Sequence, residues 1–157
     1  MNRFVLITRR PAESVELKEQ LTPSGLTLRP FPDMRLQDVA DESGWEAVAR
    51  SQAQTDPETW IVLASPRAPE RFARGCGERR LEPLLELPAA AVGPSTAGAA
   101  EKAGLQVRLV GPGNGKGLAR ELIEILRPES LVIFACGRER RRELPEMLEE
   151  NGHTVLP

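Results

Sequence analysis

The amino-acid sequence predicts an α/β protein built on a mostly parallel sheet. Short apolar runs alternate with amphipathic stretches along the chain, which is the pattern of successive strand–helix units. Several amphipathic stretches end in glycine, a residue that readily adopts the positive φ of a helix C-terminus. The length of 157 residues is enough for one ordinary domain with a buried core.

The first predicted strand is residues 4–7. Pro11 follows it, where a helix can begin because the missing N–H of proline has no partner in the first turn. Leu17 and Leu21 share one face of this helix, and Gly25 ends it.

Residues 26–31 then form an extended piece interrupted by proline. Residues 32–59 are polar and weakly periodic apart from Trp45, Val48 and Ala49, which indicates a crossover containing a short helix.

A strong apolar strand follows at residues 60–64. Ser65 and Pro66 are a suitable N-cap and first-turn pair for the next helix, which carries Ala68 and Phe72 and is expected to be short.

The C-terminal half repeats the pattern. Strands are expected at residues 89–92, 107–110 and 131–134. The helices between and after them have apolar faces. Leu118, Leu122, Ile125 and Leu126 form one such face at i, i+4, i+7, i+8 spacing, and Leu144, Met147 and Leu148 mark another. Three helix-to-strand corners share a glycine at the helix end, namely Gly25, Gly104 and Gly152.

Composition excludes several classes of function. The formal net charge is −2, which gives no overall field to attract nucleic acid or an anionic membrane. Two cysteines and one histidine cannot build a structural zinc site within the chain. The sequence has neither a signal peptide nor a membrane-spanning stretch, so we expect a cytoplasmic protein that needs no metal or cofactor.

The glycine-rich loop at residues 111–117 invites comparison with a phosphate-binding loop. It is one residue too short between Gly111 and Gly115, and Gly117 replaces the Ser or Thr that would hold magnesium. A dinucleotide fingerprint fails as well, because Lys116 occupies its third glycine position. A flexible connection is favoured over a nucleotide cradle, and an anion at the helix start stays open.

Candidate binding residues follow the strands, at the rim where open parallel sheets hold their ligands. Helix capping is a sufficient explanation for each turn alone, but several turns at one edge favour an anion-binding rim. The candidates are Thr8, Arg9 and Arg10 after the first strand, Ser65, Pro66 and Arg67, then Gly93, Ser95 and Thr96, and finally Gly137 and Arg138.

Two other features favour ordinary structural roles. The arginines at 138 and 140–142 alternate with Glu139 and Glu143, which is typical of a solvated helix face. Cys136 follows an apolar strand with no histidine near it in sequence, so packing is favoured over a nucleophilic role.

The turns taken together resemble uroporphyrinogen-III synthase, the haem-pathway enzyme that closes a linear tetrapyrrole. The resemblance extends over essentially the whole chain, although each motif alone is weak. The matching segments are VLITR with Pro11 near the start, WIVLASP at 60–66, AVGPSTA at 91–97 leading to Ala103-Gly104, and LVIFACGR at 131–138 followed by Glu143-Leu144 and EENGH at 149–153.

The resemblance implies two flavodoxin-like domains, each a parallel sheet with helices on both faces, with the substrate held in the cleft between them. Residues 1–31 would be the opening βα unit of a discontinuous first domain, and residues 32–157 the flavodoxin-like middle domain. Pro157 lies where the chain would return to complete the first domain. We therefore expect the chain to be inactive by itself, and the full-length protein to be a monomer.

The family's chemistry fits an anion-binding rim. Its substrate, hydroxymethylbilane, carries eight carboxylates; it loses its terminal hydroxyl, inverts ring D through a spiro intermediate and closes to uroporphyrinogen III. By this resemblance, Ser65 and Arg67 match the family's turn that faces the cleft, and Thr96 matches the family's Gly-x-x-Thr-Ala turn. The catalytic group stays unassigned, because the tyrosine proposed in the family lies beyond Pro157, consistent with a chain that has no tyrosine.

The chain departs from the family pattern in two places. Ser65-Pro66-Arg67-Ala68 replaces Ser-x-Asn-Ala, and Cys136-Gly137 replaces Arg-Gly. Two alternatives stay open: a degenerate domain that binds a tetrapyrrole or a partner, and a nucleotide-binding protein that uses residues 111–117.

Overall fold

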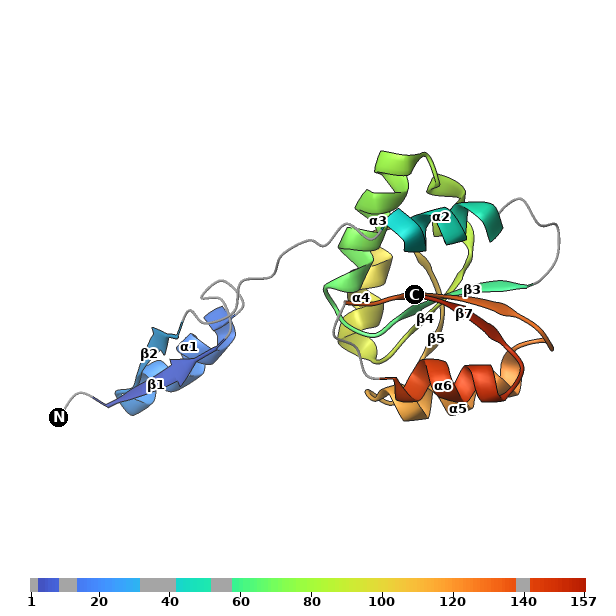
Figure 1. Cartoon of the computed structure of the whole chain (residues 1–157). Helices are drawn as coiled ribbons and strands as arrows, with labels where there is room; N and C mark the ends of the chain where they lie inside the picture. The colour runs from blue at the N-terminus through green and yellow to red at the C-terminus, as the bar shows by residue number, and fades with distance from the viewer. Residues whose placement is uncertain (1–2, 9–13, 32–41, 52–57, 138–141) are drawn as a thin grey trace. The chain divides into compact units, whose positions relative to one another are not determined.

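The computed structural model describes residues 3–8, 14–31, 42–51, 58–137 and 142–157 (Figure 1). The chain divides into two compact units, Met1–Ala40 and Asp41–Pro157. The boundary expected after residue 31 falls next to residues outside the described ranges, so it stays a prediction.

The C-terminal unit is built on a five-stranded sheet. Its strands run in the order β5-β4-β3-β6-β7, and every neighbouring pair is parallel. They are β3 (Thr59–Leu63), β4 (Pro88–Ala91), β5 (Gln106–Val110), β6 (Leu131–Ala135) and β7 (Thr154–Leu156).

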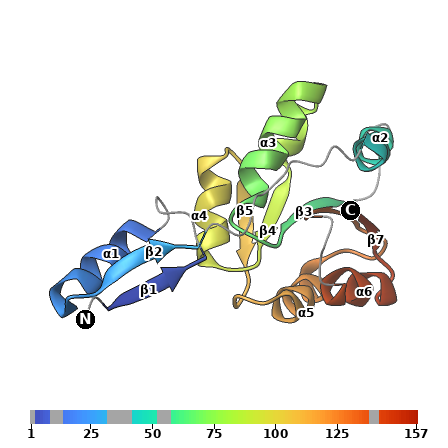
Figure 2. The same cartoon turned by 60° about the vertical axis from the view of Figure 1, so that its left-hand side comes forward.

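Helices cover both faces of this sheet (Figures 1 and 2). On one face lie α2 (Glu42–Ser51), α3 (Ala68–Arg79) and α4 (Pro94–Lys102), and on the other α5 (Gly115–Ile125) and α6 (Glu143–Glu150). A short 3-10 helix, η3 (Glu82–Glu86), leads into β4.

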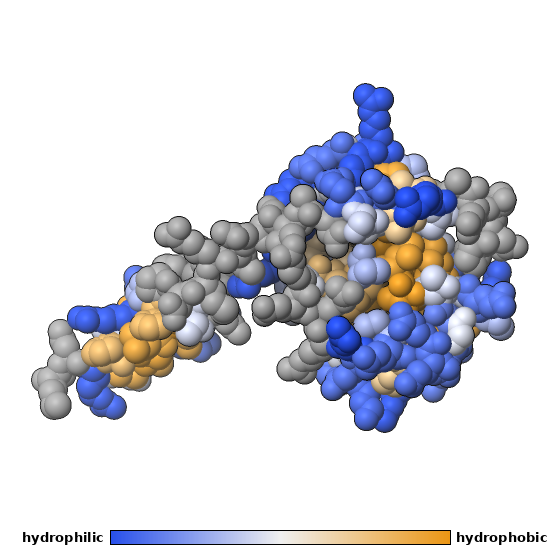
Figure 3. Space-filling model, in the orientation of Figure 1, coloured by the Kyte–Doolittle hydropathy of each residue, from blue (hydrophilic) through white to orange (hydrophobic). Residues whose placement is uncertain are grey.

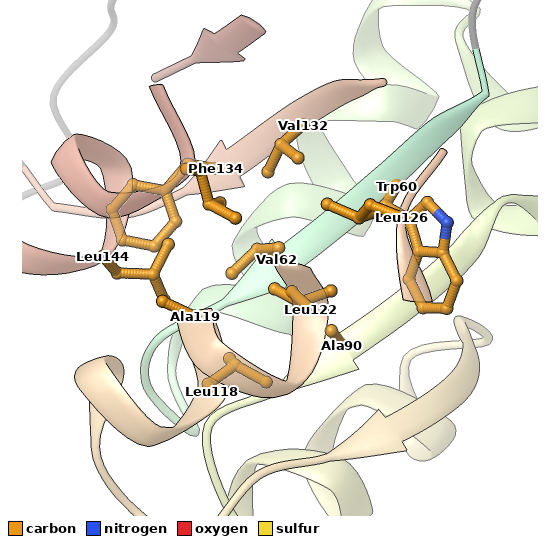
Figure 4. Close-up of a cluster of buried hydrophobic side chains, with 11 residues drawn as sticks. Trp60, Val62, Ala90, Leu118, Ala119, Leu122, Leu126, Val132, Phe134 and Leu144 are labelled. Atoms are coloured by element: carbon orange, nitrogen blue, oxygen red, sulfur yellow. The ribbon is translucent and has the colours of Figure 1, made fainter. Parts of the chain in front are cut away.

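The central strand β3 divides the core into two clusters because successive side chains of a strand point to opposite faces. Trp60 and Val62 pack with Leu118, Leu122 and Leu144 of α5 and α6 (Figure 4). Residues 61 and 63 join the other cluster, beneath α2, α3 and α4. Because both faces are buried, β3 reads as an unbroken apolar run rather than an alternating one.

The strand order places a topological switch point beside β3. After β3 the chain moves outward to β4 and β5, and then returns to the opposite side of β3 for β6 and β7. Counted within the unit, the order is 3-2-1-4-5, as in the first five strands of the dinucleotide-binding fold, whereas flavodoxin itself has 2-1-3-4-5. Both orders bind ligands at the carboxyl ends of the strands next to the switch point.

The described residues of the N-terminal unit form one βαβ motif. Strands β1 (Phe4–Ile7) and β2 (Thr27–Pro30) pair in parallel, and α1 (Val15–Leu21) with the 3-10 turn η2 (Thr22–Ser24) connects them. Gly25 adopts φ 68° at the end of this connection.

The predicted α/β class is therefore confirmed, with the strands within one or two residues of their expected positions. Two local predictions are wrong. The helix after β3 is twelve residues long rather than short, and it begins at Ala68 rather than directly after Ser65. Within the described residues, no helix is long and apolar enough to cross a membrane.

Candidate functional site

The carboxyl ends of four strands line up at one edge of the five-stranded sheet. Leu63 of β3 pairs with Ala91 of β4 and with Ala135 of β6, and Ala91 pairs with Val110 of β5. The turns that follow these residues are therefore neighbours along a single edge. This edge also contains the switch point between β3 and β6.

The turn after β3 is a β-turn closed by a hydrogen bond of 3.2 Å from the Ala68 amide to the Ser65 carbonyl. Pro66 occupies the second position of the turn, where its fixed φ is suitable, and Arg67 has φ −93° and ψ −17°, as expected for the third. This turn separates Ser65 from the helix, so Arg67 rather than Ser65 is the N-cap residue of α3. Ser65, Pro66 and Arg67 are all exposed at the edge.

The turn after β4 leads directly into α4. The Gly93 carbonyl accepts hydrogen bonds from the Thr96 amide, at 3.1 Å, and from the Ala97 amide, at 3.0 Å. Ser95 is exposed, whereas Thr96 has 1% of its surface exposed. Ser95 is therefore the residue that this turn offers to a ligand in the present conformation.

The loop after β5 is fastened to the β4 turn. The Gly113 amide donates to the Val92 carbonyl at 2.7 Å, and a Cβ added to Gly93 would lie only 3.2 Å from the Gly113 Cα. Asn114 caps α5 by accepting a hydrogen bond of 2.7 Å from the Gly117 amide. Hydrogen bonds and close packing thus hold this loop in place, and the preference for a connection over a nucleotide cradle stays a prediction.

The last turn follows β6, where Cys136 is half-buried and Gly137 is exposed. Arg138 lies outside the described residues. Thr8 follows β1 and is exposed in the N-terminal unit, while Arg9 and Arg10 lie outside the described residues. The structure thus brings Ser65, Pro66, Arg67, Gly93, Ser95, Thr96 and Gly137 to one sheet edge of the C-terminal unit.

Several positive groups gather at this edge, together with acidic side chains such as Glu70 in the first turn of α3. Helices α3, α4 and α5 all begin here, so their first-turn N–H groups and the positive ends of their dipoles gather at the edge. Arg67 and Lys116 add two exposed cationic side chains at the starts of α3 and α5. Such an arrangement stabilises carboxylate or phosphate groups without a metal.

The other chemically reactive side chains lie away from this edge. Cys76 is fully buried within α3, and burial raises the pKa of its thiol to about 11, with the Glu82 carboxylate adding to the rise and Arg79 opposing it. His153 is also buried, with 6% of its surface exposed. Among the residues that the structure describes, no three His, Cys, Asp or Glu side chains form a group that could hold a metal ion.

Sequence reasoning did not find the contact between the β4 turn and the β5 loop. The only hint in the sequence is that both turns contain glycines. Gly93 and Gly113 lie in close contact, and Gly113 adopts φ 94°. A single sequence does not show that two distant glycines are in contact. The contact can be recognised only once β4 and β5 are known to be neighbours.

The chain is similar to proteins of one family. A model of the uroporphyrinogen-III synthase family matches residues 15–157. No match is found among curated proteins.

Solved structures give the same similarity. A mutant uroporphyrinogen III synthase of Thermus thermophilus superposes with a TM-score of 0.69 at 21% identity, covering 99% of this chain and 60% of that chain. The wild-type enzyme in a second crystal form gives 0.61 at 22% identity, with 100% and 60% covered. A further structure of the synthase from this organism gives 0.56 at 20% identity, with 99% and 60% covered. These identities show a shared fold, and the chain spans about three fifths of the length of each solved relative.

Proposed function

The chain belongs to the uroporphyrinogen-III synthase family, and we propose that it takes part in closing hydroxymethylbilane to uroporphyrinogen III, with inversion of ring D. The observation that carries the proposal is the family match over residues 15–157. The positive groups at this edge of the C-terminal unit support it, because a substrate with eight carboxylates needs many anion-binding groups on one surface.

In this proposal the chain's groups bind and orient the substrate. Arg67 and Lys116 neutralise propionate or acetate side chains, and the first-turn amides of Ser95 in α4 and Lys116 in α5 donate hydrogen bonds to them. Ser65 and Ser95 add hydroxyl donors at the same edge. Gly137, which is exposed, lets the backbone approach the ligand closely, whereas Gly93 is buried against Gly113.

Orientation is the main source of the proposed catalysis. Loss of the terminal hydroxyl leaves an electrophilic azafulvene, which ring D attacks through its substituted carbon to give the spiro intermediate. That intermediate must form faster than direct closure of the free chain, which gives the uninverted isomer. Holding the two ends of the substrate in reacting geometry lowers the entropic part of the barrier, which can be worth several kcal/mol.

The chain spans about 60% of the length of the solved relatives, and the proposed activity belongs to a polypeptide of their length. We propose that the C-terminal unit supplies one wall of the substrate site. Residues 1–31 would belong to the opposing domain, together with the part of a family-length polypeptide that this chain does not span.

The test is the isomer composition formed from hydroxymethylbilane. The chain is supplied with the remaining part of a family-length polypeptide, and the oxidised products are separated by chromatography. An excess of the type III isomer over the no-protein reaction is expected. Arg67→Gln should lower that excess and raise KM, whereas Arg50→Gln, which removes an exposed arginine from α2, should change neither.

Formation of the type I isomer alone, at the spontaneous rate, would contradict the proposal. Binding of uroporphyrin to the C-terminal unit without any type III product would then assign the chain to the degenerate, tetrapyrrole-binding alternative.

A further inference from the structure

The β4 turn and the β5 loop are joined beyond the ends of their strands. The paired part of β4 ends at Ala91. Past it, the Gly111 amide donates to the Ala91 carbonyl at 2.8 Å, and the Gly113 amide donates to the Val92 carbonyl at 2.7 Å. These two glycines flank Pro112, so β4 holds the backbone of the loop on both sides of this proline.

The Pro112 ring packs against the first turn of α5. A Cβ added to Gly117 would overlap the Cγ atom of Pro112 and lie 3.0 Å from its Cδ atom. The closed ring has no side-chain rotamers through which these atoms could move aside, and it fixes φ as well. Pro112 is exposed and belongs to neither core cluster. The contact between position 117 and the ring therefore lies at the surface of the candidate site.

The start of α5 is held from its other sides too. Leu118 and Leu122 are fully buried and anchor the helix in the core (Figure 4). A Cβ added to Gly115 would lie 3.5 Å from the Leu144 Cβ of α6. The surface over α5 and α6 is mostly hydrophilic (Figure 3), as expected for helices whose apolar faces are already buried. The first turn of α5 thus lies between the core, α6 and the proline ring.

These contacts set the position of Lys116 relative to Ser95. Each is the second residue of its helix, and each is exposed. Lys116 belongs to the turn that packs against the Pro112 ring. Ser95 belongs to the turn that begins at Gly93, where an added Cβ would lie 3.2 Å from the Gly113 Cα. The two turns are therefore connected through backbone and ring atoms, with no flexible side chain between them.

We propose that Pro112 is a positioning residue of the candidate site. Packed on Gly117, its ring holds the first turn of α5 in place beside the β4 turn, so that Lys116 and Ser95 bind neighbouring carboxylates of one ligand together. A ligand that meets groups already in place loses less free energy in ordering them. This inference rests on the proposed function, because it assigns Pro112 a role at the same edge.

The experiment titrates the whole chain with uroporphyrin, the oxidised form of the expected product, which keeps its carboxylates. Porphyrin fluorescence gives the Kd, and NMR follows the Ser95 amide. Gly117→Ala forces a methyl group against the Pro112 ring, so it should shift the Ser95 resonance and raise the Kd at least about fivefold. Gly98→Ala is the matched control in α4, because an added Cβ there has no atom within 4 Å. It should change neither quantity.

A double variant tests whether the two residues act through each other. Pro112→Ala removes the Cγ and Cδ atoms at an exposed position, so the chain should stay folded while the Kd rises about two- to threefold. In Pro112→Ala/Gly117→Ala the overlap is gone. The Kd and the Ser95 resonance should then equal those of Pro112→Ala, whereas independent roles would give additive losses.

Three results would overturn the inference. They are an unchanged Kd in both single variants, additive losses in the double variant, and absence of uroporphyrin binding by the natural chain. Urea unfolding of each variant shows that the measured protein is folded. If the natural chain directs no type III product but the expected pattern of Kd values is found, the proposed reaction fails and the positioning role of Pro112 stands.

Discussion

Gly75 allows α2 to pack closely on α3, because the Trp45 ring occupies the space where a side chain at position 75 would lie. A Cβ at Gly75 would overlap that ring and lie 2.9 Å from its Cη2 atom. Trp45 also stacks on Phe72, with ring centroids 5.6 Å apart, and lies 4.8 Å beneath the Arg79 guanidinium. Arg79 in turn pairs with Glu42 of α2 at 2.6 Å.

We expect Gly75→Ala to destabilise the protein by about 1–2 kcal/mol. Alanine gains up to about 1 kcal/mol of helix propensity over glycine, but forcing a methyl group against the indole ring costs about 1–3 kcal/mol. Gly77→Ala, in the same helix but with no atom within 4 Å of its added Cβ, should instead stabilise by up to about 1 kcal/mol. Urea unfolding of both variants measures the difference, and equal stabilisation by the two would show that Trp45 does not pack on position 75.

The buried Cys76 thiol makes stability depend on alkaline pH. Its pKa is raised from 9.0 to about 11 in the folded protein, chiefly by burial. The folded state therefore holds this proton more tightly than the unfolded state, so the contribution is fully present below about pH 9 and is lost as the pH rises toward 11. The loss can reach about 2–3 kcal/mol.

Unfolding free energies measured between pH 8 and pH 11 test this expectation. The chain has no tyrosine, and its other thiol, Cys136, is present in both proteins compared here. Cys76→Ala should be less stable at pH 8 because of its cavity, but should lose less stability on going to pH 11. A parallel decline in the two proteins would exclude Cys76 as the source.

At the level of single elements, the Asn114 cap holds the start of α5 at the candidate site. Its side chain accepts the Gly117 amide at 2.7 Å, which satisfies one first-turn donor of the helix. Asn114→Ala should cost about 1 kcal/mol of stability, and Asn114→Asp, which keeps the acceptor, should cost less than half of that. Urea unfolding measures both. If the two variants lose equal stability, the side-chain cap does not contribute.

Sequence patterns predicted the strands better than the helix boundaries. β1 was predicted at its observed residues, and β3, β4 and β6 to within one residue, because buried parallel strands are continuous apolar runs that few other elements imitate. The helix after β3, expected to be short, continues through Gly75 and Gly77 although glycine has low helix propensity. Gly75 is there to admit Trp45, and that contact joins residues thirty positions apart. The local sequence pattern does not reveal a contact between residues so far apart in the chain.

The candidate site, too, could be predicted from the sequence only in part. Turns after successive strands of a parallel sheet must meet at one edge, so Ser65, Ser95 and Gly137 could be placed together before any coordinates were known. The exposure of each residue could not be predicted. Thr96 carries the family-like motif yet is buried, whereas Ser95 beside it faces solvent. Exposure depends on how α4 packs on the sheet, which is a tertiary property.

At the scale of the whole molecule, the two units differ in how much apolar surface they bury. The five-stranded sheet has a cluster of buried side chains on each face. Among the described residues of the N-terminal unit, Ile7 is the one large apolar side chain that is buried, while Phe4, Leu6, Val15, Leu17 and Phe31 are exposed. Two strands and one helix without a sealed core are marginally stable in water.

We therefore expect the chain to unfold in two steps under native conditions. Amides of β1 and β2 should exchange through local opening with free energies of no more than about 2 kcal/mol, while those of β3 and β6 should exchange only through global unfolding of their unit, at about 5 kcal/mol or more. Native-state hydrogen exchange at increasing urea resolves the two groups, since globally exchanging amides converge on one steep dependence on denaturant. Val62 and Val132, both fully buried in the centre of the sheet, are the reference amides. Arg29 and Val5, whose amides face the partner strand, reaching the same free energies as these two would mean that the N-terminal unit forms part of one cooperative core.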